Sequence, residues 1–217
     1  MTKISFELWG LELLEPMGFL LNMVMCLVSV ALYLRMKEED ATDFKKYWTN
    51  FYWLFAVSTL FGGFSHLLYN YFGMMGKIPG WLAAVLAISS IEMAVASQYE
   101  SRQDTLKNLV RIKAVIILLL LSIDLQFTWV MVHTAIGLLI ILGASAIHHI
   151  RMGQSHYYLF LYSIGLMILT LPFRLGGIDL HLWFNRDDVS HVFMIISLVL
   201  FYKGVKHREL AFKEAVI

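Results

Sequence analysis

The chain has 217 residues, of which 59% are hydrophobic and only 15% are charged. Soluble domains carry charged residues at about a quarter of their composition, so these proportions indicate an integral membrane protein. The net charge of +1, with no basic stretch interleaved with aromatic residues, gives no reason to expect a nucleic-acid partner. The single cysteine, Cys26, excludes an intrachain disulfide and a cysteine-based zinc site.

Seven stretches of the chain are long and apolar enough to cross a bilayer, which takes about 20 residues of helix. They cover residues 16–36, 48–73, 80–99, 107–124, 126–149, 155–175 and 187–206. The connectors are short, and neither an internal repeat nor a linker divides the chain. The sequence therefore predicts an all-α integral membrane protein, a seven-transmembrane helix bundle that forms a single domain over residues 1–217.

The basic residues predict the orientation of this bundle. With the N-terminus outside, the outer side holds only Lys3, Lys77, Arg174 and Arg186, and all other Lys and Arg residues fall on the cytoplasmic side. Because short cytoplasmic loops carry the excess of Lys and Arg, this predicts an outside N-terminus and a cytoplasmic C-terminus. The tryptophans, Trp48 among them, fall near predicted helix ends, where interfacial anchors are expected. We expect a multi-pass protein of a plasma or inner membrane.

Polar groups inside a bilayer cost several kcal/mol, so they are candidates for function. In or just inside the predicted spans they are Glu15, Asn22, His66, Asn70, Glu92, His133, Arg174, Asp187, Asp188 and His191. At 1.5 Å per residue, Asn22, His66 and His133 lie roughly 10 Å below the outer face. His191 lies roughly 6 Å below it, so four helices contribute to one polar layer, whereas Glu92 lies roughly 20 Å deep.

The segment DDVSH at the start of the last span is the sharpest local signal. Asp187 and His191 are spaced i, i+4, and Asp188 and His191 i, i+3, so either pair can present two ligands on one helix face. A carboxylate and an imidazole, completed by His66 from the second span, match a catalytic zinc site with one open position. Such a metal suits amide or ester hydrolysis.

Each of these residues also has a structural interpretation. His133 can simply hydrogen-bond between helices. Asp187 or Asp188 can cap the last helix, and Glu15 can cap the first. Arg174 can extend to the outer interface.

Three segments resemble the CREST superfamily of seven-helix membrane proteins, which includes alkaline ceramidases and the progestin and adiponectin receptors. The superfamily's Glu, followed seven residues later by Asn, is matched by Glu15 and Asn22. Its Gly-rich stretch ending in a zinc-binding His resembles LFGGFSH, which ends at His66. Its seventh-helix His-x-x-x-His resembles DDVSH, so the resemblance implies zinc ligands at His66, Asp187 and His191.

The chain also departs from that pattern. Gly62 stands where these enzymes have a serine, Lys77 stands where an acidic residue is expected, and Asp187 replaces the first histidine of the pair. The resemblance therefore implies that Glu92 or Asp188 would have to serve as the catalytic acid or base.

The leading hypothesis is a zinc-dependent intramembrane hydrolase that cleaves amide or ester bonds of a membrane lipid. Calcium is a second candidate metal, which no specific spacing supports. The alternative is a non-enzymatic sensor or small transporter that uses the same polar layer to bind a lipid or small molecule. A retinal protein is disfavoured, because Lys77, Lys113 and Lys203 all fall at edges of predicted spans. The oligomeric state does not follow from the sequence.

Overall fold

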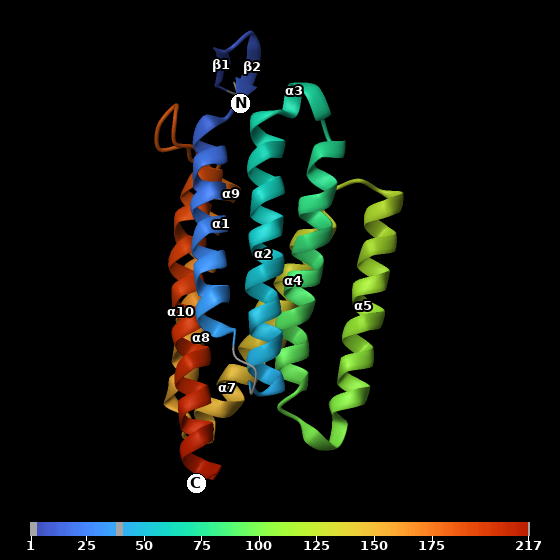
Figure 1. Cartoon of the computed structure of the whole chain (residues 1–217), viewed down its shortest axis with the longest axis vertical. Coiled ribbons are helices and arrows are strands. Elements are labelled where there is room, and N and C mark those ends of the chain that lie inside the picture. The colour runs from blue at the N-terminus through green and yellow to red at the C-terminus, as the bar shows by residue number, and fades with distance from the viewer. Residues whose placement is uncertain (1–3, 38–40, 217) are drawn as a thin grey trace.

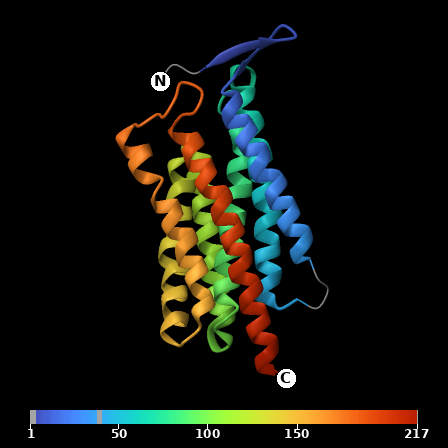
Figure 2. The same cartoon turned by 90° about the vertical axis from the view of Figure 1, so that its left-hand side faces the viewer.

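The computed structural model describes residues 4–37 and 41–216. Lys3 and residues 38–40 of the first predicted connector lie outside the described residues. Each of the seven predicted stretches is helical, and the helices run side by side in one elongated bundle (Figures 1 and 2). The all-α fold class is thereby confirmed.

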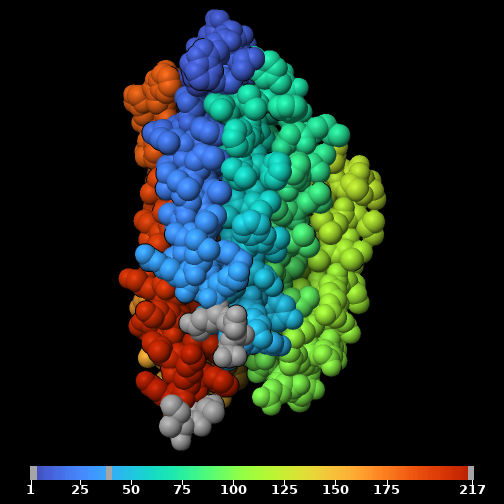
Figure 3. Space-filling view, in the orientation of Figure 1, coloured from blue at the N-terminus to red at the C-terminus, as the bar shows by residue number. Residues whose placement is uncertain are grey.

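The chain begins with a short hairpin that the sequence analysis did not predict. Strands β1 (Ser5–Leu8) and β2 (Leu11–Leu14) pair antiparallel, with Ser5 opposite Leu14. Trp9 and Gly10 form the turn, and both have positive φ values (51° and 77°), as two-residue hairpin turns require. The hairpin covers the end of the bundle at which α1 begins, beside the α3 segment (Figure 3).

The first half of the bundle is built from four long helices. Their bounds match the predicted spans to within a few residues, except that α2 begins earlier and ends earlier than predicted. In chain order the elements are α1 (Pro16–Met36), α2 (Asp43–Leu67), α3 (Tyr69–Phe72), the 3₁₀ turn η1 (Met75–Lys77), α4 (Ile78–Ala96), the 3₁₀ turn η2 (Glu100–Arg102) and α5 (Gln103–Ile123).

The second half contains broken helices and one long terminal helix. The fifth predicted span contains a π-helical segment, η3, a type of irregularity often found at functional sites. The elements are α6 (Thr128–Ala135), η3 (Ile136–Leu142), α7 (Gly143–Arg151), the 3₁₀ turn η4 (Ser155–Tyr157), α8 (Tyr158–Ile168), α9 (Leu171–Gly176) and α10 (Arg186–Val216).

Five helical segments of the described chain are long and apolar enough to cross a membrane: Pro16–Met36, Met75–Ala96, Thr128–Arg151, Ser155–Gly176 and Arg186–Glu214. The α2 and α5 helices are not among these five. Helix α2 packs against α1, α4 and α10, so less of its surface has to be apolar to face lipid. Its sequence accordingly includes many Tyr, Trp, Thr and Ser residues. Helix α5 carries three basic residues within two turns but presents a row of half-exposed Leu, Ile and Val side chains.

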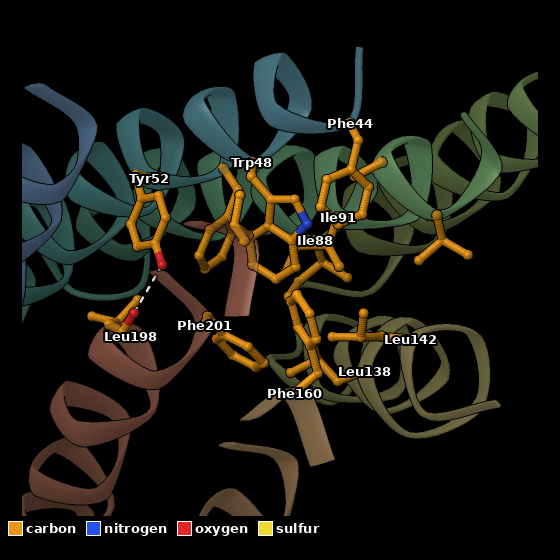
Figure 4. Packing of buried hydrophobic residues seen from close by; sticks show 14 of the residues in the cluster. Phe44, Trp48, Tyr52, Ile88, Ile91, Leu138, Leu142, Phe160, Leu198 and Phe201 are labelled. Atoms are coloured by element: carbon orange, nitrogen blue, oxygen red, sulfur yellow. Dashed lines mark hydrogen bonds between the residues drawn. The ribbon is translucent and has the colours of Figure 1, made fainter. Parts of the chain in front are cut away.

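An aromatic core fills the half of the bundle away from the hairpin (Figure 4). Trp48 is fully buried and packs on Phe160 and Phe201, with ring centroids 5.5 and 5.3 Å away. The prediction of Trp48 as an interfacial anchor is therefore wrong, because α2 begins five residues before Trp48 and turns this side chain inward. The Tyr52 hydroxyl donates to the Leu198 carbonyl over 2.8 Å, which ties α2 to α10.

Candidate metal centre at the hairpin end of the bundle

Glu15 and His66 meet at the end of the bundle nearest the hairpin. The His66 Nδ1 lies 2.7 Å from Glu15 Oε2, and both side chains are largely shielded from solvent. Because an ionised carboxylate only accepts hydrogen bonds, the ring donates from Nδ1, which leaves its lone pair on Nε2. Metal-binding histidines are commonly held in this way by a carboxylate behind the ring.

The backbone of Glu15 is strained. It has φ 47° and ψ 58°, a left-handed conformation that is uncommon for residues other than glycine. Glu15 occupies the N-cap position of α1, but its side chain makes no capping hydrogen bond there. Glu15 thus stands at the predicted cap position but does not cap the helix with its side chain. Its carboxylate contacts His66 instead. Strain of this kind often occurs at functional sites.

Two glycines of the LFGGFSH segment let α1 and α2 approach closely. A Cβ atom on Gly62 would lie 3.0 Å from Asn22 Oδ1, and one on Gly63 would lie 2.7 Å from Met23 Cε. Small residues at such crossings are typical of helix packing in membranes. The close approach brings Asn22 of α1 next to the helix that carries His66.

Asn22 links this pair of helices to α10. Its side-chain Nδ2 donates to the Gly18 carbonyl over 2.7 Å and lies 3.4 Å from His191 Nε2. If Nε2 accepts from Asn22, the proton of the ring is on Nδ1. That Nδ1 atom is buried and has no hydrogen-bond partner among the described residues.

Asp187 and Asp188, which the sequence left as alternatives, have different environments. Asp188 is 1% exposed, and its Oδ2 accepts from the Asn185 backbone N–H over 2.9 Å. The Asn185 side chain in turn accepts from the backbone N–H groups of Asp187 and Asp188, so Asn185 and Asp188 form a reciprocal cap. Asp188 Oδ1 is buried and has no partner in the described part of the chain. Asp187 is half-exposed and faces Arg174 at 3.7 Å.

A cavity of about 340 Å³ opens beside these groups. Glu15 and Asp188 line it together with the loop between α9 and α10, including Asp179 and Trp183. Arg186 fixes this loop, because its backbone N–H and its guanidinium both donate to Asp179 (3.0 and 3.1 Å). These hydrogen bonds lower the pKa of Asp179 below its ordinary value of 3.8.

The remaining polar residues lie elsewhere. Glu92 is completely buried, about 14 residues along α4, and pairs with Lys113 of α5. His133 is also buried, with Nε2 3.0 Å from the Val85 carbonyl and 3.3 Å from Ser89 Oγ, so it links α6 to α4 as the structural interpretation expects. Asn70 is exposed on α3. The structure thus joins Glu15 to His66 and Asn22 to His191, and it places Asp188 on the cavity that Glu15 also lines. Glu92, His133 and Asn70 do not belong to these contacts.

The position of Lys113 differs from its prediction. Helix α5 begins at Gln103, so Lys113 is its eleventh residue of 21 and lies near its middle, not at an edge. The prediction that Lys113 falls at an edge of its helix is therefore wrong. The sequence did contain a signal for this pair, since Glu92 is a single acidic residue in an apolar helix and needs a cationic partner.

No group of three or more His, Cys, Asp or Glu side chains within residues 4–37 and 41–216 is already arranged to hold a metal ion. The donor types at the hairpin end of the bundle nevertheless fit zinc, because two imidazoles and a carboxylate are a common zinc ligand set. The partnerless buried oxygen of Asp188 fits a cation further, since buried polar groups are normally satisfied.

Comparisons with known proteins give one family match. No curated protein and no solved structure matches the chain. One family model matches residues 17–210, a segment that contains Asn22, His66, Asp188 and His191 and begins two residues after Glu15. The chain belongs to this family, which is described as a family of unknown function (DUF6962).

Proposed function

We propose that this protein is a seven-helix integral membrane protein with an outside N-terminus and a cytoplasmic C-terminus, in which α2 and α5 also cross the bilayer. The hairpin and the end of α10 lie at opposite ends of the bundle, which agrees with an odd number of crossings (Figure 1). The exposed Leu, Ile and Val side chains of α5 suit contact with lipid tails.

We further propose that the outer-end group binds zinc and hydrolyses an amide or ester bond of a membrane lipid, as the resemblance to the CREST superfamily implies. The observations that carry the proposal are the Glu15–His66 and Asn22–His191 contacts at one end of the bundle, and Asp188, which lines the same cavity as Glu15 and has a buried oxygen without a partner among the described residues. Two imidazoles favour zinc over calcium, which prefers six to eight oxygen ligands.

The chain's own residues would each have a distinct role. His66, His191 and Asp188 would hold the metal. Glu15 would keep the proton of His66 on Nδ1, and His191 would exchange its hydrogen bond from Asn22 for the metal at Nε2. A bound zinc ion would polarise the scissile carbonyl and make a water molecule more acidic. The loop fixed by Asp179 and Arg186 would cover the reacting groups on the side of the cavity.

Elemental analysis of the purified protein tests the metal. Wild type should contain about one zinc per chain, and His66→Ala and His191→Ala should each contain almost none. His148→Ala, which removes an exposed histidine from α7, is the matched control and should keep the metal. Zinc-free wild type would refute the metal centre.

Activity is tested separately with the zinc-loaded protein. It should release fatty acid from ceramide-like or ester lipids reconstituted in the same membrane, and His191→Ala should not. If zinc is bound but a broad lipid panel shows no turnover, the site belongs to a non-enzymatic sensor or transporter.

A further inference from the structure

A second cavity, of about 250 Å³, lies at the opposite end of the bundle from the candidate metal centre. It is formed where the end of α1, the start of α2 and the last turns of α10 meet, at the lower end of Figure 1. Four of its nine lining residues are basic, and three helices contribute them: Arg35, Lys45, Lys206 and Lys213.

The negative charge in this lining is small. Glu209 contributes the one acidic side chain among the described residues that line the cavity. Its carboxylate accepts from the Thr42 hydroxyl and from the Arg208 guanidinium, both at 2.7 Å. The four basic side chains therefore leave a net positive lining, which suits a phosphate group.

Apolar side chains adjoin the basic ones. Leu210 of α10 lines the cavity and is 51% exposed, and Met36, Tyr202 and Val205 line it as well. A cavity that is lined by both basic and apolar side chains matches a ligand that carries both a phosphate and acyl chains. A free phosphate would contact only the basic side chains.

We infer that this cavity binds the phosphate headgroup of an anionic lipid of the cytoplasmic leaflet. The basic residues would contact the phosphate, and the exposed Leu210 would contact the upper part of the acyl chains. Basic cavities between membrane helices on this side are known to suit such headgroups. At about 250 Å³ the cavity is smaller than most sites for drug-sized ligands, which agrees with a compact headgroup.

Native mass spectrometry of the full chain, released from phosphatidylcholine nanodiscs that contain some phosphatidic acid, tests this inference. Wild type should retain phosphatidic acid in preference to phosphatidylcholine. The double variant Lys206→Ala/Lys213→Ala should bind it about 25-fold more weakly, at about fivefold for each cation removed. The matched control is Lys46→Ala/Lys203→Ala, which removes two exposed cations outside the cavity, one from α2 and one from α10.

The outcomes separate the ligand sources. If both double variants lose the lipid equally, only the general surface charge attracts it and the inference is refuted. If inorganic phosphate binds the detergent-solubilised protein as tightly as phosphatidic acid does, the cavity is a soluble-anion site and the lipid assignment is refuted. Zinc content should be unchanged in both variants, so this result is independent of the proposed metal centre.

Discussion

The imidazole of His66 and the carboxylate of Glu15 lie 2.7 Å apart, although 51 positions separate these residues in the sequence. The contact joins the strained N-cap of α1 to the last turn of α2. It explains why a glutamate stands at a cap position without capping the helix. If His66 binds a metal through Nε2, the carboxylate behind the ring sets both the tautomer and the basicity of the ligand.

Replacing Glu15 with Gln should therefore weaken zinc binding by roughly 10- to 100-fold, the usual effect of losing a carboxylate behind a metal-binding histidine. Competition with a chelator measures the affinity. Glu12→Gln, a change of the same type in strand β2, should leave the affinity unchanged, because Glu12 is exposed on the hairpin. Equal affinity of the Glu15 variant and wild type would contradict this role of Glu15.

The two aspartates of DDVSH should differ in their effect on the metal. Asp188→Asn should remove most of the zinc, because Asp188 is buried beside the cavity and has a partnerless oxygen among the described residues. Asp187→Asn should retain zinc, because Asp187 is half-exposed and faces Arg174. Elemental analysis of the two variants decides between them, and the reverse result would assign the ligand to Asp187.

The buried pair of Glu92 and Lys113 should dominate the stability of the α4–α5 contact. Lys113→Met leaves a buried carboxylate without its cation, and the free energy of unfolding should fall by about 3–5 kcal/mol. Adding Glu92→Gln should recover most of this loss, because the uncompensated charge is then gone. Denaturant titration in detergent measures these values.

The matched control for this pair is Arg111→Met. Arg111 is exposed on the same helix and bonds only locally, to Asn108. We expect a change below about 0.5 kcal/mol. A similar loss in the Lys113 and Arg111 variants would show that the pair has no special role in stability.

Gly137 in the π-helical segment should be sensitive to a single added methyl group. A Cβ there would lie 2.5 Å from Ile88 Cγ2 and 2.8 Å from Glu92 Oε1, so Gly137→Ala should destabilise by about 1–3 kcal/mol through overpacking. Gly165→Ala is the control, because a Cβ at Gly165 has nothing within 4 Å. Its unfolding free energy should be equal to or slightly above that of wild type.

The loop between α9 and α10 should lose stability in acid. The pKa of Asp179 is lowered, so its contribution is present above the unfolded pKa and is lost as the pH falls through the folded value, below about pH 4. Amide hydrogen exchange of residues 177–185 should rise over this range in wild type. In the Asp179→Asn variant, amide exchange of these residues should be faster at neutral pH and should show no further rise in acid. The control variant Asp124→Asn, which lies in another loop, should behave as wild type.

The sequence predicted the helical stretches well, because long apolar runs between short polar connectors leave little freedom in where helices form. It missed the hairpin, because ten residues with one Trp-Gly turn give a weak strand signal beside such runs. It named Asn22, His66, His133 and His191 as one polar layer, because each lies near the predicted outer end of its span.

Depth along a helix alone could not decide which polar residues meet. His133 has a depth similar to that of the others but faces α4, and Lys113 was placed at an edge because the start of α5 was set four residues too late. Composition and periodicity thus determined the helices and the end of the bundle at which polar groups gather. Only the tertiary structure decided that Asp188 and not Asp187 turns inward, because that choice depends on the rotation of α10 about its axis against α1, which no local pattern encodes.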